Sequence, residues 1–143
     1  MTSNGFTGGC LCGAVTYTSS ELPIATIHCC CVDCRKLGGT GHSTHSPVHD
    51  EAFSLKGEVR EYSKTADSGN RIHRFFCPVC ACPIHHRRDG LEGLTVIRTS
   101  SMDDPELAKP DRVIYTSSKV SWDDIDPQLP QWEFMSPAQK KPK

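Results

Sequence analysis

The chain has 143 residues, of which 36% are hydrophobic and 7% aromatic, and its formal net charge is −1. This length predicts one domain over residues 1–135, followed by a loose, polar tail over 136–143, and the lean apolar content favours a domain stabilised partly by metal. A net charge of −1 is a poor electrostatic basis for binding nucleic acid, which needs a basic patch, so a nucleic-acid partner is not expected. No apolar run approaches the ~18–20 residues of a membrane span, so a membrane partner is not expected either.

Short alternating or β-branched segments predict an all-β fold with metal-binding knuckles at strand ends. The expected strands are, in chain order, 15–18, 24–27, 42–48, 53–56, 59–62, 71–76, 94–97 and 113–116. Asp103 to Glu106 can open one helical turn, with Asp as its N-cap. No longer segment shows a helical period, so we expect no long helix.

Cysteine occurs nine times, mostly in three tight clusters. Cys10 and Cys12 form the first pair, and Cys77 and Cys80 form the third. A tetrahedral zinc site needs four ligands, usually supplied as two short knuckles. These two pairs therefore predict one closed, structural Cys₄ zinc site, although 64 residues separate Cys12 from Cys77.

The middle cluster offers three suitably spaced thiols, on Cys29, Cys31 and Cys34. Cys30 is expected to point away, because neighbouring side chains of an extended segment face opposite sides. Three protein ligands and an open position are typical of a catalytic metal. The alternatives are a second structural site, completed by His28, a distant histidine, Cys30 or Cys82, and an empty or redox-active thiol cluster.

Metal chemistry also needs a proton carrier, and histidine serves near neutral pH. His42 and His45 are the first candidates, and their odd spacing puts them on opposite faces of a strand, so at most one should face the site. Arg35 follows Cys34 directly. Its guanidinium could bind a substrate carboxylate or balance the anionic zinc–thiolate group.

The start of the chain has no basic and apolar pattern of a secretory signal, and an odd number of cysteines suits metal binding better than a complete disulfide framework. Both observations predict a cytoplasmic protein, in which thiols stay reduced.

Three motifs, found in a fixed order along the chain, make it resemble a known protein family. They run from Gly8 to Tyr17, from Cys29 to Arg35 and from Phe76 to Cys80, and similar flanks continue through 99–105 and 121–125. On these motifs the chain resembles the glutathione-dependent formaldehyde-activating (GFA) family, which includes the centromere protein V group. The resemblance implies a two-sheet, β-tent-like zinc-binding fold.

By match of position, the resemblance implies a structural zinc on Cys10, Cys12, Cys77 and Cys80, and a second zinc on Cys29, Cys31 and Cys34 that faces the ligand cleft. The family's reaction joins formaldehyde and glutathione reversibly through a carbon–sulfur bond, which gives S-hydroxymethylglutathione. The chain departs from the family at two positions: Cys30 stands where histidine is frequent, and Ala81 where glycine is usual. Neither departure removes an expected ligand.

The function expected from the sequence is therefore that of a zinc-dependent carbon–sulfur lyase, or its reverse, acting on a small thiol or thiol adduct such as that of glutathione. A soft, anionic zinc–thiolate site suits a sulfur ligand better than a peptide or phosphate ester. The alternatives are a non-catalytic, zinc-stabilised binding module and an enzyme that acts on a specialised metabolite without glutathione.

Overall fold

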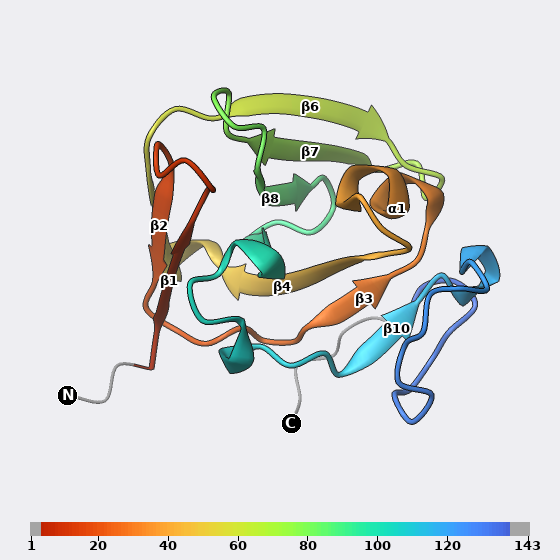
Figure 1. The fold of residues 1–143 in the computed structure, drawn as a ribbon. Coiled ribbons are helices and arrows are strands. Elements are labelled where there is room, and N and C mark those ends of the chain that lie inside the picture. Colours follow the sequence, from red (N-terminus) through yellow and green to blue (C-terminus); the bar gives the residue numbers. More distant parts are fainter. Residues whose placement is uncertain (1–3, 138–143) are drawn as a thin grey trace. The chain divides into compact units, whose positions relative to one another are not determined.

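The regular structure in the computed structural model, which describes residues 4–137, is almost all β (Figure 1). Its strands are β1 (Phe6–Gly9), β2 (Thr16–Ser19), β3 (Ile27–Cys29), β4 (Ser43–His49), β5 (Phe53–Lys56), β6 (Arg60–Thr65), β7 (Arg71–Phe76), β8 (Pro83–Arg88), β9 (Leu94–Arg98) and β10 (Arg112–Ile114). They form a three-stranded sheet in the order β1-β2-β5 and a seven-stranded sheet in the order β10-β3-β4-β9-β8-β7-β6. The predicted two-sheet, all-β fold class is confirmed.

The helical elements are short. The helix α1 (Val32–Gly38) has seven residues, and four 3₁₀ turns cover Asp50–Ala52, Thr99–Ser101, Pro105–Leu107 and Thr116–Ser118. Among residues 4–137, no helix has the length and apolar character needed to cross a bilayer.

The chain forms two compact units, each built from two stretches of sequence. Unit 1 comprises Met1–Ile24 and Ser46–Lys109, and unit 2 comprises Ala25–His45 and Pro110–Lys143. Strand β4 therefore contributes its first three residues to unit 2 and its last four to unit 1. That residues 1–135 form one domain stays a prediction.

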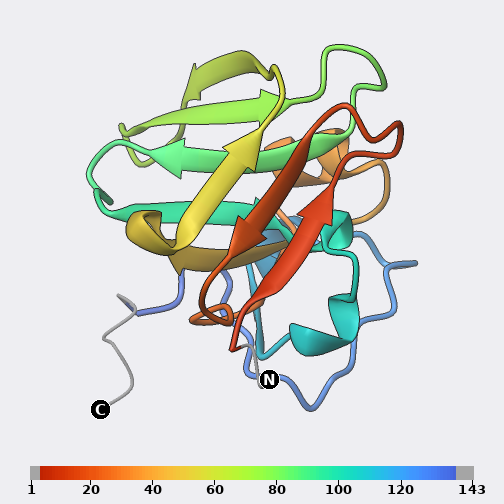
Figure 2. The same ribbon diagram turned by 90° about the vertical axis from the view of Figure 1, so that its left-hand side faces the viewer.

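The core of unit 1 gathers around Tyr17, whose ring is almost fully buried. Its hydroxyl is hydrogen-bonded to Ser101 Oγ at 2.7 Å, which satisfies the one polar atom of the ring. Gly8 lies opposite Tyr17 in the β1–β2 pair, and a Cβ there would come within 2.3 Å of that ring. The close approach of the Tyr17 ring to β1 therefore requires glycine at position 8. Figure 2 shows the two paired strands, β1 and β2, in red.

Unit 2 is built on β3, which pairs with β10 in parallel and with the first half of β4 in antiparallel orientation. Successive side chains of β3 point to opposite faces of this sheet. Cys29 packs with Ile27 and Ile114 in one apolar cluster, whereas Cys30, just after the strand, packs with Val113 and Ile125 in another.

All eight predicted strands are present, two with the same bounds and six with ends shifted by up to three residues, but three elements were missed. These are β1, β8 and α1, the last of which replaces the turn expected after Cys31. The helical turn expected at Asp103 to Glu106 forms at Pro105–Leu107, with the Asp104 side chain accepting from the Glu106 backbone N–H. In the predicted tail, Ser136 is buried, and residues 138–143 lie outside the described part of the chain.

Candidate metal centres

The first and third cysteine pairs come together in unit 1. Cys10 and Cys12 follow β1, Cys77 and Cys80 follow β7, and their four sulfur atoms all lie within 4.8 Å of one another. The Sγ atoms of Cys10 and Cys12 are 3.6 Å apart, and those of Cys12 and Cys77 are 3.8 Å apart. Zinc–sulfur bonds of ~2.3 Å in a tetrahedron place the sulfurs about 3.8 Å apart. The four thiols therefore fit a closed zinc site.

Backbone N–H groups surround these sulfurs. Val15 donates to Cys10 Sγ at 3.2 Å, and Val79 and Cys80 donate to Cys77 Sγ at 3.4 and 3.5 Å. Backbone hydrogen bonds from Cys12 and Cys82 lower the pKa of Cys80 to about 6. Because metal ligation requires thiolates, an environment that stabilises negative sulfur favours metal binding.

The knuckle at Cys77 has an unusual turn. The Ala81 N–H donates to the Cys77 carbonyl at 2.9 Å, and Ala81 has a φ of 64°, which is a left-handed conformation that favours glycine. A glycine at this position would adopt it without strain.

The middle cysteines form a second cluster in unit 2, with the sulfurs of Cys29, Cys31 and Cys34 all within 4.8 Å of one another. Cys29 ends β3, Cys31 is the N-cap of α1, and Cys34 lies in the first turn of that helix. The Cys31 sulfur accepts from the Cys34 N–H at 3.3 Å, as a capping side chain does. The helix missed at the sequence level is thus the element that aims two of the three sulfurs.

The thiols of this cluster differ in pKa. Hydrogen bonds from the Cys29 and Cys34 thiols lower the pKa of Cys31 to about 2, whereas hydrogen bonds with Cys31 and Cys34, together with burial, raise the pKa of Cys29. A thiolate at Cys31 is therefore stabilised by two thiols. Cys30 is fully buried, lies outside the cluster, and its pKa is raised to about 11 by burial.

The two candidate histidines have separate surroundings. His45 is buried, and its Nε2 lies 3.5 Å from Cys34 Sγ and 2.7 Å from Ser43 Oγ. His42 is paired elsewhere: its Nδ1 lies 2.8 and 3.0 Å from the two carboxylate oxygens of Asp123. Of the two, His45 is the histidine in contact with the sulfur cluster.

Sequence reasoning had singled out neither Ser43 nor Asp123. The His42 ring also meets the His28 ring edge-on, at 4.4 Å between centroids. Asp123 lies 81 residues after His42, and no local signal links them. Ser43 is two residues before His45, and strand alternation could have placed both on one face.

Arg35 sits on α1 directly after Cys34, and its Nε is buried without a hydrogen-bond partner among the described residues. This buried nitrogen is available to a hydrogen-bond acceptor.

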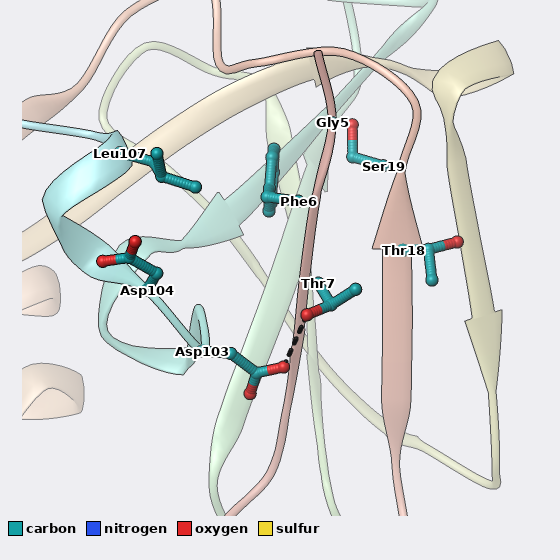
Figure 3. A pocket seen from close by; sticks show the side chains of 8 residues that line it. All are labelled: Gly5, Phe6, Thr7, Thr18, Ser19, Asp103, Asp104 and Leu107. Carbon is teal, nitrogen blue, oxygen red and sulfur yellow. Dashed lines mark hydrogen bonds between the residues drawn. The ribbon is translucent and has the colours of Figure 1, made fainter. Parts of the chain in front are cut away.

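Unit 1 also has an open groove of about 430 Å³ beside β1 (Figure 3). Phe6, Thr7, Asp103 and Asp104 are among its lining residues, and Thr7 Oγ1 donates to Asp103 Oδ2 at 2.6 Å. No cysteine or histidine lines it, so it brings no metal-ligating group to a ligand.

Comparison with known proteins identifies the family. Residues 5–118 match the glutathione-dependent formaldehyde-activating enzyme family. The chain belongs to this family. The match covers both cysteine clusters and confirms the resemblance seen in the motifs.

The fold has a solved counterpart in a Rhodobacter sphaeroides protein from a structural genomics programme. The two chains are 19% identical, the likeness covers 73% of this chain and 96% of that one, and the TM-score is 0.57. At this identity the likeness concerns the fold alone. The comparison with curated proteins finds no significant match.

Proposed function

We propose that this GFA-family chain is a zinc-dependent carbon–sulfur lyase, or catalyses the reverse addition, with a small thiol adduct such as S-hydroxymethylglutathione as substrate. The observation that carries the proposal is the three-sulfur cluster of unit 2 with His45 beside it. The family's name supports glutathione and formaldehyde as the reactants. A reduced site of this kind suits the cytoplasm, which we propose as the compartment.

The donor set fits zinc. Three thiolates leave one position of a tetrahedron, and zinc bound there would hold a substrate thiolate and polarise a nearby carbonyl. We propose the seven thiols of Cys10, Cys12, Cys29, Cys31, Cys34, Cys77 and Cys80 as ligands of two zinc ions, one structural and one catalytic.

The residues of unit 2 would manage the proton. In the addition direction, His45 takes the proton of the substrate thiol, the sulfur forms a bond to the carbonyl carbon, and the carbonyl oxygen receives that proton back. The reverse sequence cleaves the same carbon–sulfur bond. Ser43 orients the His45 ring through their 2.7 Å hydrogen bond. Arg35 is proposed to bind a substrate carboxylate, and His42, held by Asp123, takes no part in this scheme.

One observation favours a second candidate. In a tetrahedral zinc site with one Zn–N and one Zn–S bond, sulfur and nitrogen lie about 3.6 Å apart. The Cys34–His45 separation of 3.5 Å agrees with that value. His45 as the fourth ligand would close a Cys₃His site, and the protein would then be a zinc-stabilised binding module.

His45→Gln distinguishes the two roles, with His42→Gln as its matched control. If His45 carries the proton, the variant keeps two zinc ions per chain against a mild chelator and loses formation of S-hydroxymethylglutathione by at least about 100-fold. If His45 is a ligand, the variant releases the second zinc readily, and the lyase proposal is wrong. His42→Gln should keep both the metal and most of the activity.

Cys31→Ser tests the cluster itself. We expect it to retain one zinc instead of two and to lose activity while staying folded, because the four-cysteine site is untouched. Cys30→Ser is the control, since Cys30 is buried outside the cluster and should leave two zinc ions in place. Full zinc content in Cys31→Ser, measured by elemental analysis under reducing conditions, would contradict the assignment.

A further inference from the structure

The part of the large sheet that belongs to unit 1 has two chemically different faces. Antiparallel pairing aligns Tyr62 with Arg74, and Arg74 with His86, and His86 with Val96. Residues two apart on each strand share a face, so the register defines one face from β6 to β9. Figure 1 shows β6, β7 and β8 side by side. We call the face defined by this register the basic face. Its charged and histidine positions are Arg60, Lys64, Arg74, His86, Arg88 and Arg98.

The basic face carries five formal positive charges, and the same strands place no Asp or Glu on it. This contrasts with the net charge of −1 for the whole chain. At a protein surface, a concentration of one charge sign attracts the opposite sign.

On the opposite face of the same strands, His73 and Arg87 pair with carboxylates, whereas Arg71 donates to the Ser63 hydroxyl. His73 lies 3.0 Å from both Glu61 and Asp89, and Arg87 Nη1 lies 2.9 Å from Asp50. Among the described residues, no carboxylate forms an ion pair with Arg74 or Arg88 on the basic face. The Nε of Arg88 is moreover buried without a hydrogen-bond partner in that part of the chain. Buried polar atoms usually have partners, so the Nε of Arg88 is available for a hydrogen bond to a ligand.

The cations at the centre of the face lie close together. Residues directly opposite each other across two strands are ~5 Å apart at Cβ and diagonal neighbours ~7–8 Å, which places Arg74 beside His86 and Arg88. Burial, and then the charges of Arg74 and Arg98, lower the pKa of His86 to about 3. His86 is therefore neutral at pH 7, so the arginines alone carry the positive charge at the centre of the basic face.

We propose that the basic face is a binding site for the carboxylate or phosphate groups of a small anionic molecule, with Arg74 and Arg88 as its principal ligands. Guanidinium groups bind such oxyanions through two parallel hydrogen bonds. Arg74 and Arg88 are partly buried, which favours a small ligand, and the exposed Tyr62, Arg60 and Lys64 form the rim. The proposal does not depend on the lyase reaction, because none of these residues belongs to a cysteine cluster.

The test compares two double variants that change the formal charge equally. Arg74→Gln/Arg88→Gln removes two cations from the basic face, whereas Arg71→Gln/Arg87→Gln removes two from the opposite face of the same strands. Citrate is the carboxylate probe and pyrophosphate the phosphate probe, and calorimetry measures both at ~150 mM salt. We expect binding of at least one probe to weaken by roughly 10–100-fold in the first variant and by less than threefold in the second.

The preferred probe distinguishes a carboxylate ligand from a phosphate ligand. A third variant, Arg74→Lys/Arg88→Lys, keeps the charge and should still bind more weakly than the wild type, because lysine lacks the planar fork. If the glutamine variant misfolds, the lysine variant still tests the proposal. Thermal melts measure the folded stability of all three variants. Equal losses in the two glutamine variants, binding of neither probe, or binding only of a single-stranded oligonucleotide would overturn the proposal.

Discussion

His85 packs between two aromatic rings, with ring centroids 4.6 Å from Phe75 and 5.2 Å from Phe53. The Phe75 ring is nearly parallel to it, and the Nδ1 of His85 is buried without a hydrogen-bond partner among the described residues. Burial, and then the charge of Arg87, lower the pKa of His85 to about 4. This histidine is therefore a neutral member of the packed interior.

Replacement of His85 by phenylalanine should reduce the sensitivity of the protein to acid. Because the folded pKa lies below the unfolded value of about 6.5, the unfolded chain binds the proton first as the pH falls. The stability is thus complete above pH 6.5 and is lost as the pH falls towards 4. Between pH 7.5 and 5.0 the wild type should lose about 2 kcal/mol more unfolding free energy than His85→Phe.

Urea unfolding of both proteins at the two pH values measures this difference. The clustered cysteines are common to both proteins, so the effect of their protonation cancels in the comparison. Identical pH dependence in the two proteins would show that His85 does not resist protonation in the folded state.

At the scale of elements, short pieces of irregular backbone position the sulfurs. The helix α1 ends at Gly39, whose φ of 73° and N–H bond to the Arg35 carbonyl form a left-handed C-cap. The spacing of Cys29, Cys31 and Cys34 predicted three convergent sulfurs, but a seven-residue helix is too short for a visible apolar period. Its cap residues, Cys31 and Gly39, were the only local signal available.

The Ala81 turn of the other cluster offers a stabilising substitution. A left-handed conformation costs a residue with a Cβ roughly 1–2 kcal/mol, and glycine avoids that cost at the expense of extra unfolded-state entropy. We expect Ala81→Gly to raise the unfolding free energy by about 0.5–1 kcal/mol and to slow zinc release to a chelator. Ala66→Gly, at an alanine without positive φ, is the control and should destabilise the protein slightly. Equal effects of the two changes would show that the backbone of Ala81 is not strained.

At the scale of the whole molecule, the four-sulfur cluster shares a side chain with the core of unit 1. Cys77 is fully buried in the core of unit 1 and also belongs to the four-sulfur cluster. The same side chain is therefore part of the core and of the candidate metal site. The binding free energy of a structural zinc contributes directly to folding.

Cys77→Ser should therefore lose the structural zinc and the cooperative unfolding transition of unit 1. Cys82→Ser is the matched control: Cys82 packs against the same core without belonging to the cluster, so we expect a cost of about 1 kcal/mol and full zinc content. Calorimetry and elemental analysis check both variants. A Cys77→Ser protein that unfolds cooperatively and binds two zinc ions would disprove the site assignment.

The strand-rich fold class and the grouping of seven cysteines into a set of four and a set of three could be predicted from the sequence, because side-chain alternation and knuckle spacing are local properties of the chain. The contact of His45, and not His42, with the sulfurs becomes visible in the three-dimensional structure, as does the pairing of Asp123 with His42. No local pattern in the sequence indicated either of them. The three-dimensional structure also gathers cations from four strands, scattered in sequence, on one face. These arrangements depend on strand register and on contacts between residues far apart in the sequence. The spacing of residues along the chain reveals neither of them.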